Sequence, residues 1–305
     1  MASPNSARSG VGWWQRRLAP LDVSTSIIAD HPVLLETASA AYADWTAADP
    51  AGPPAIEIRL RLAEASAAGV SDGIQVEGSR LMLAGEGIEG TADARTGRGC
   101  CSVPPRLLED AAALAAEVVD PILLFLLARM GRTPLHAAGI VLGETAVLLA
   151  GRSGAGKSTL ALAAAADGLS VLSDDTIHVQ LGPRLRVWGF ARAVHVFPDE
   201  APPGDHAIRI QAGKRKATVA LPAPARGRHA DRAILVVLDR GERLALEPIP
   251  AEEAMARLMR LDPGFDLLRE QSAAAIGALA AGGAWRLTLT ADPGAAIALL
   301  RATFG

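Results

Sequence analysis

The chain reads Gly151-Arg152-Ser153-Gly154-Ala155-Gly156-Lys157-Ser158 over residues 151–158. This stretch follows the pattern G-x-x-x-x-G-K-[ST], which is typical of a loop that binds nucleotide phosphates. The apolar run 146–150 before it is typical of a buried strand, and the Ala- and Leu-rich run 159–166 after it is typical of a helix. Glycines let the backbone wrap closely around phosphates, and the free N–H groups at the start of a helix point at the anion. The sequence therefore predicts a strand, a phosphate-binding loop and a helix in direct succession.

Each part of this loop has an expected role. The backbone of Gly151, Arg152, Ser153, Gly154, Ala155, Gly156, Lys157, Ser158 and Thr159 is expected to surround the phosphates. Lys157 would reach the outer phosphates, and the Ser158 hydroxyl would bind Mg²⁺. The base-reading motif Asn-Lys-x-Asp of GTPases is absent, which favours ATP as the nucleotide. Lys214, in the basic run 213–216, is either part of a solvated charged segment or a mobile cation that closes over the phosphates.

Composition excludes several classes of protein. The chain has 305 residues, of which 50% are apolar, so it can build a large core. A formal net charge of −3 argues against nucleic acid or an anionic membrane as partner, and 4% aromatic residues argue against base stacking. The first residues lack the apolar stretch of a signal peptide, and charged residues interrupt the apolar run 111–130. Cys100 and Cys101 are expected to be reduced and buried, as in a cytoplasmic protein.

The pattern along the chain predicts an α/β protein with two parts. Residues 1–30 are expected to be an irregular N-terminal segment, and residues 31–131 a smaller β-rich α+β domain. Within it, short apolar runs between glycines suggest an antiparallel meander over 55–103, and a helix follows over 106–129 with a kink at Pro121. Residues 132–305 alternate strands and helices around a central mixed sheet that contains the phosphate-binding loop.

A second group of polar residues follows the loop at a suggestive spacing. Asp174 and Asp175 end the apolar run that comes one helix beyond Lys157. Carboxylates at this place handle Mg²⁺ or the attacking nucleophile in phosphoryl transfer, so one could bind the metal while the other accepts the proton of a hydroxyl. The alternative is that the pair only begins a turn. His136, just before the two strands that lead into the loop, is either structural or lies near the transferred phosphate.

Three other polar residues have weaker claims. Asp239 ends the apolar run 233–238, as a metal-binding carboxylate of an ATPase would, but Arg240-Gly241 after it resembles a hairpin turn, so a turn residue is the preferred interpretation. His178 is expected at the surface. His195 is expected to be packed, or else to line a substrate cleft.

The motifs of residues 133–182 resemble those of HPr kinase/phosphorylase and its bacterial relatives. The resemblance is carried by Leu135-His136-Ala137-Ala138-Gly139, the loop 151–159 and Leu172-Ser173-Asp174-Asp175. It implies a phosphate-loop (P-loop) kinase domain of the HPr kinase / PEP carboxykinase type over 132–305, with ATP and Mg²⁺ as cofactors. It also implies that one carboxylate of the Asp174-Asp175 pair activates an acceptor serine, and that Lys157 and His136 lie at the phosphates. Of the two possible orders, we assign Asp174 as the base and Asp175, together with Ser158, as the metal ligand.

The resemblance also indicates the kind of acceptor. HPr kinases carry a second signature rich in Glu, Arg and Gly, whereas this chain has an apolar segment at 188–198, which argues against HPr as substrate. A peptide or protein acceptor, as for the shorter relatives from biosynthetic gene clusters that modify lasso-peptide precursors, fits better. Self-association into a homo-oligomer is an expectation of the same resemblance. Two alternatives remain open, namely a P-loop ATPase or nucleotide-dependent switch that acts on a protein partner, and a binding protein with a degenerate nucleotide site.

Overall fold

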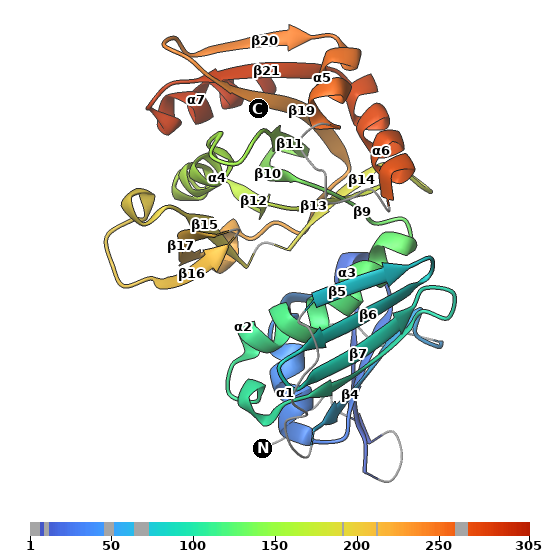
Figure 1. The fold of residues 1–305 in the computed structure, drawn as a ribbon. Helices are drawn as coiled ribbons and strands as arrows, with labels where there is room; N and C mark the ends of the chain where they lie inside the picture. Colours follow the sequence, from blue (N-terminus) through green and yellow to red (C-terminus); the bar gives the residue numbers. More distant parts are fainter. Residues whose placement is uncertain are drawn as a thin grey trace. The chain divides into compact units, whose positions relative to one another are not determined.

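The fold is that of a computed structural model, which describes residues 7–8, 12–45, 52–63, 73–190, 192–211, 213–259 and 268–305. Its contacts divide the chain into two compact units, residues 1–130 and residues 131–305, coloured blue to green and green to red in Figure 1. Both units are mixtures of helices and strands, so the protein is of the α/β kind that the sequence pattern predicts.

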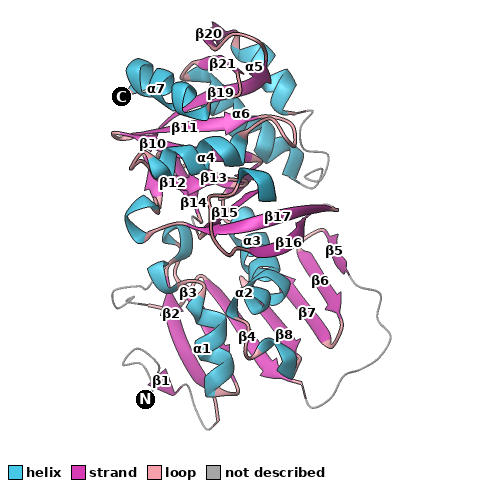
Figure 2. Cartoon of the chain, turned by 90° about the vertical axis from the view of Figure 1, so that its left-hand side faces the viewer, coloured by secondary structure: helices cyan, strands magenta, loops and turns pink. Residues whose placement is uncertain are grey.

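The first unit is built on an eight-stranded sheet in the order β1-β2-β3-β4-β8-β7-β6-β5. Its strands are β1 (Ala7–Arg8), β2 (Trp14–Leu18), β3 (Thr25–Ala29), β4 (Ile56–Leu62), β5 (Gly73–Glu77), β6 (Arg80–Gly85), β7 (Ile88–Asp93) and β8 (Arg98–Val103). The helices are α1 (Pro32–Ala40), α2 (Ala111–Leu114) and α3 (Asp120–Arg129), and they lie on one face of the sheet, as Figure 2 shows. Alternating side chains explain this arrangement: Ile56, Ile58 and Leu60 are fully buried, whereas Arg59 and Arg61, on the alternate positions, are exposed.

Two expectations for this unit were wrong. The segment 1–30 is not irregular where it is described, because β2 and β3 are inner strands of the sheet. All five residues of β3 are buried, so the strand lacks the alternation that marks a half-exposed one. The meander is limited to β5 to β8, because β4 pairs in parallel with both β3 and β8.

The long helical segment of the first unit also differs in detail from its prediction. A π-helical turn at Ala115–Val119 separates α2 from α3 and ends two residues before Pro121. A wider turn there accommodates a proline ring, which would clash with the carbonyl four residues earlier in a regular helix. The segment Ala111–Arg129 is long and apolar enough to span a membrane by length and composition, and half of its most apolar window is buried inside the protein.

The second unit has a six-stranded mixed sheet in the order β12-β10-β11-β19-β21-β20. These strands are β10 (Ala137–Leu142), β11 (Thr145–Ala150), β12 (Ser170–Ser173), β19 (Arg232–Arg240), β20 (Ala245–Ile249) and β21 (Ala284–Leu289). The three strands β11, β19 and β21 are parallel neighbours, and the other pairings are antiparallel. Thus the strand that leads into the predicted phosphate loop lies in the middle of the sheet.

Helices cover both faces of this sheet. The helices are α4 (Lys157–Ala166), α5 (Ala251–Leu258), α6 (Arg269–Ala281) and α7 (Pro293–Phe304). Helices α4 and α7 pack on one face, whereas α5 and α6 pack on the other. A four-stranded sheet shares the second face with them and consists of β9 (Thr133–Leu135), β13 (Ile177–Gln180), β14 (Arg186–Gly189) and β18 (His229–Ala230).

A small three-stranded sheet completes the second unit. It contains β15 (Ala193–Val196), β16 (Ala207–Gln211) and β17 (Lys214–Ala220), with β17 in the centre. Val194, Val196, Ala217 and Val219 extend from it into the same apolar cluster that holds α4 and α7. The small sheet is therefore anchored beside the N-terminal end of α4, where the glycine loop lies.

Candidate active site

The loop between β11 and α4 has the conformation that its glycines allow. Gly154 and Gly156 have φ angles of +85° and +110°, a region that other residues rarely adopt. A Cβ atom on Gly156 would also lie 3.0 Å from Leu289. Helix α4 begins at Lys157, so its first backbone N–H groups are not used within the helix. The result is a ring of main-chain donors at the positive end of a helix dipole, which suits an anion.

This loop borders a cavity of about 340 Å³ that contains most of the predicted site residues. The lining residues are His136, Ser153, Gly154, Gly156, Lys157, Ser158, Thr159, Asp174, Asp175, His195, Phe197, Glu200, Lys214, Lys216 and Arg240. Four of these side chains are cations and three are carboxylates. Such a mixture can neutralise phosphates with the cations and bind a hydrated metal ion or a proton with the carboxylates.

Lys157 is the most buried cation of the cavity, with 7% of its surface exposed. Its ammonium group donates to the carbonyl oxygen of Gly151 at 2.7 Å and lies 3.4 Å from that of Arg152. Those bonds hold the ammonium across the mouth of its own loop. The charge is therefore held at the loop in which the sequence motif predicts the outer phosphates.

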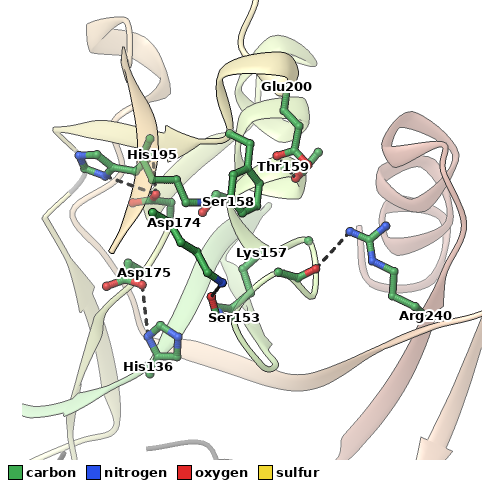
Figure 3. A pocket seen from close by; sticks show the side chains of 15 residues that line it. His136, Ser153, Lys157, Ser158, Thr159, Asp174, Asp175, His195, Glu200 and Arg240 are labelled. Carbon is green, nitrogen blue, oxygen red and sulfur yellow. Dashed lines mark hydrogen bonds and ion pairs between the residues drawn. The ribbon is translucent and has the colours of Figure 1, made fainter. Parts of the chain in front are cut away.

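Asp174 and Asp175 reach the same cavity because the strand stops just before them. Strand β12 ends at Ser173, whose hydroxyl accepts bonds from the backbone N–H groups of Asp175 and Thr176 at 3.3 and 3.1 Å. This turn breaks the alternation of a strand, in which two adjacent side chains would point to opposite faces. Figure 3 shows both carboxylates on the same side of the glycine loop.

The two carboxylates have different neighbours. Asp174 is 5% exposed and accepts the backbone N–H of His195 at 2.7 Å, with the His195 ring 3.6 Å away. The side chain of Asp175 is 45% exposed, and its oxygen lies 3.2 Å from Nδ1 of His136. One carboxylate is thus held rigidly by the main chain of β15, whereas the other faces the open part of the cavity beside a histidine (Figure 3).

The small three-stranded sheet closes the cavity from the side of β15 and β17. Lys214 donates to the hydroxyl of Ser153 in the glycine loop at 3.2 Å. Thr159 donates to Glu200, which follows β15, at 3.1 Å. Lys216 lies over the ring of Phe197, with 3.4 Å between its ammonium and the ring centre. The small sheet therefore contributes two cations, one carboxylate and one aromatic ring to the site.

Lysines are concentrated at this cavity to an unusual degree. The chain has 30 lysines and arginines, but Lys157, Lys214 and Lys216 are its only lysines, and all three line the cavity. Ordinary surface charge is supplied by arginine. A lysine ammonium is a compact charge on a flexible stem, which suits contact with a phosphate that moves during a reaction.

The remaining predicted site residues border a second cavity. Gly151, Arg152 and Ala155 lie on the β19 side of the loop, while Ser153 and Gly154 border both cavities. Four residues that line the first cavity were not expected at the site, namely Phe197, Glu200, Lys216 and Arg240. The scarcity of lysine was a signal that could have identified Lys216, and nothing in the local pattern marked the other three.

Three expectations about single residues need correction. Asp239 is not in a hairpin turn, because β20 pairs with β21 and not with β19; Asp239 lies opposite Thr288 in the parallel part of the sheet. His178 is 2% exposed and not at the surface, since β13 is buried on both faces. Cys101 is buried as expected, but Cys100 is exposed on the other face of β8.

A divalent metal would find oxygen ligands in this cavity. The described residues contain no group of three or more His, Cys, Asp and Glu side chains arranged around a metal position. Mg²⁺ does not need such a cage, because it keeps several waters and is bound by one or two carboxylates together with substrate phosphates. The Ser158 hydroxyl and the Asp175 carboxylate, both lining the cavity, fit this role.

The likeness of this chain to known proteins is distant. No protein-family model matches the sequence, and no curated protein matches it. Among solved structures, the HPr(Ser) kinase/phosphatase from Coxiella burnetii is similar, with 15% identity and a TM-score of 0.31 over 56% of this chain and 95% of that one. A likeness at this level defines no activity.

Proposed function

We propose that this protein is an ATP-dependent kinase that transfers the terminal phosphoryl group of ATP to a hydroxyl, serine being the expected one, of a peptide or protein. Its second unit would be a P-loop kinase domain of the HPr kinase / PEP carboxykinase type. The observation that carries the proposal is the single cavity shared by the glycine loop, Lys157 and the Asp174-Asp175 pair. These groups supply the two requirements of phosphoryl transfer, which are neutralised phosphates and a positioned acceptor.

The loop and the lysines would bind the triphosphate. The N–H groups at the start of α4 and the Lys157 ammonium would hold the inner and outer phosphates. Lys214 already contacts the loop through Ser153, and it would exchange that hydroxyl for a phosphate oxygen when the nucleotide binds. Mg²⁺, bound by Ser158 and Asp175, would neutralise charge that develops between the outer phosphates.

We assign Asp174 as the general base for the acceptor hydroxyl. The His195 N–H fixes its carboxylate, and a base must be held in one orientation to accept a proton efficiently. Asp175 is the more exposed carboxylate and has room for a metal ion that retains its waters. His136, which contacts Asp175, would lie at the edge of the transferred phosphoryl group and help to orient the metal ligand.

The proposal is tested by following the labelled terminal phosphate of ATP. The protein is incubated with Mg²⁺, γ-labelled ATP and a library of serine-containing peptides and proteins, and the acceptors are analysed for label. We expect a phosphorylated acceptor with the wild type and none with Lys157→Ala, while circular dichroism of the variant is unchanged. Transfer by Lys157→Ala at the wild-type rate would show that the loop does not act in catalysis.

One observation favours an ATPase or nucleotide-dependent switch as a second candidate. Asp239 lies at the end of β19, the parallel neighbour of the strand that enters the loop, where an ATPase holds its metal through a carboxylate. Its carboxylate is, however, paired with Arg257 at 2.6 Å and borders the second cavity. Product analysis separates the two candidates, because a switch releases free phosphate and leaves every acceptor unmodified.

A further inference from the structure

The glycine loop has a second cavity on its other side. This cavity measures about 540 Å³ and is bordered by residues 151–155 of the loop, by Val237, Leu238, Asp239 and Arg240 of β19, and by Arg257 of α5. Ser153, Gly154 and Arg240 border both cavities, so the two spaces meet along the loop. Figure 3 shows Arg240 across the loop from Asp174 and Asp175.

The second cavity lies where an α/β sheet commonly binds ligands. Strands β11 and β19 are parallel neighbours, and both end at this cavity. The helix that follows β11 packs on one face of the sheet, whereas the helices that follow β19 pack on the other. Connections that leave in opposite directions open a crevice at the carboxyl ends of the two strands.

The lining of this cavity suits a nucleoside. Val237 and Leu238 give it an apolar wall. The Arg257 side chain is about one-third exposed and is held by Asp239 at 2.6 Å and Glu253 at 3.0 Å, so its guanidinium is fixed. A fixed guanidinium stacks well on an aromatic ring, and the half-exposed carboxylate of Asp239 can accept bonds from sugar hydroxyls or a base amino group.

We propose that this second cavity holds the ribose and base of the nucleotide whose phosphates lie on the loop. The inference rests on the proposed function, because it takes the first cavity, which Asp174 and Asp175 line, as the site of the terminal phosphoryl group. If the terminal phosphate lies in the first cavity and the inner phosphates follow the loop past Ser153 and Gly154, the nucleoside lies on the β19 side of the loop. Arg240, which donates to the carbonyl of Gly154 at 3.3 Å, stands at this passage.

The first cavity offers a less suitable seat for the base. Phe197 is the only Phe, Tyr or Trp residue that lines it, and the ammonium of Lys216 already lies 3.4 Å from the centre of that ring. A base stacked on that face would have to displace this cation. The β19 side has no such obstacle among the residues that line it.

The inference is tested by comparing ATP with inorganic tripolyphosphate, which carries the phosphates without the nucleoside. Calorimetric titrations at equal Mg²⁺ are made with wild type, with Arg257→Met and with Arg301→Met. Arg301 is a matched control, because it forms another arginine–aspartate pair of 2.6 Å, with Asp167 at the far end of α4. We expect wild type to bind ATP at least about fivefold more tightly than tripolyphosphate, and Arg257→Met alone to lose that difference.

Other results would overturn the inference in distinguishable ways. Equal affinities for ATP and tripolyphosphate in the wild type would remove the nucleoside subsite and leave the phosphate-binding function intact. Failure of both probes to bind would overturn the proposed function and this inference together. Equal weakening of both probes by Arg257→Met would mean that Arg257 acts only through the loop. Loss of the ATP preference in Phe197→Leu, with Arg257→Met unchanged, would place the base in the first cavity.

Discussion

Replacing Gly189 by alanine should lower both the stability and the activity of the second unit, although Gly189 does not line the cavity that contains Asp174 and Asp175. Gly189 ends β14 and packs directly on Leu172 of β12. A Cβ atom at this position would lie 2.0 Å from the carbonyl oxygen of Leu172 and 2.3 Å from its carbonyl carbon. Both neighbours are backbone atoms, so they cannot move aside as the end of a flexible side chain would.

The size of the effect follows from that distance. Restoring ordinary contact requires the two strands to separate by roughly 1.4 Å. Overpacking of this kind costs about 3 kcal/mol of unfolding free energy. Leu172 is followed within two residues by Asp174, whose carboxylate is bound to the main chain of β15. A shift of about 1 Å in a reacting group lowers a rate by roughly 100-fold, so we expect a loss of that order in phosphoryl transfer.

The assay combines urea denaturation, followed by circular dichroism and by hydrogen exchange of β12 and β14, with the rate of label transfer from ATP. Gly277→Ala serves as the matched control, because Gly277 lies within α6 and its Cβ would meet only a methionine methyl at 3.8 Å. A Gly189→Ala protein with the wild-type urea midpoint and the wild-type rate would refute the argument that this close backbone approach sets the position of Asp174.

The remaining predictions concern single groups. Asp174→Asn should reduce the rate of phosphoryl transfer at saturating Mg²⁺ by about 100-fold or more. Asp175→Asn should mainly raise the Mg²⁺ concentration that gives half of the maximal rate. A titration of rate against Mg²⁺ in both variants would show whether the roles of base and metal ligand are reversed. MgATP should protect Lys157, Lys214 and Lys216 from an amine-directed reagent, since all three line one cavity, and mass spectrometry that finds one of them still fully labelled would exclude it from the nucleotide site. Gly277→Ala itself should raise stability by about 0.5–1 kcal/mol, because glycine is a poor helix former; an unchanged urea midpoint would contradict this. Burial raises the pKa of the Cys101 thiol to about 12, whereas the thiol ionises near pH 9 in the unfolded chain. The contribution of this thiol to the unfolding free energy is therefore complete below pH 9 and is lost as the pH rises toward 12. Cys101→Ala should make the urea midpoint less dependent on pH between pH 9 and 12.

Local sequence was sufficient to locate the central strands of the main sheet in the second unit. The expected runs at 146–150 and 233–238 correspond to β11 and β19, because buried parallel strands read as continuous apolar stretches. The strands of the first unit were harder to predict from the sequence. Strand β3 is buried on both faces but is only five residues long, and its Thr-Ser-Ile-Ile-Ala has neither the alternation of a half-exposed strand nor a fully apolar run.

Strand pairing was the main source of error, and it affected the interpretation of Asp239. A turn at 240–241 next to an apolar strand indicates a hairpin when only neighbouring residues are considered. In the structure β21, which comes more than forty residues later, inserts between β19 and β20. That pairing depends on α5 and α6 returning the chain across the sheet, a long-range event with no local signal, and it places Asp239 at a cavity edge instead of in a turn.

The sequence by itself determined the glycine loop, its lysine and its hydroxyl, because their conformation depends on the glycines and on the helix start within a few residues. Only the tertiary structure decided that Asp174 and Asp175 share one cavity, since this requires β12 to end at Ser173 and the backbone of His195 to arrive from another sheet. Glu200, Phe197 and Lys216 likewise join the loop only because the small sheet folds beside α4. Contacts between residues that are tens of positions apart are set by packing of the whole unit, and no local pattern records them.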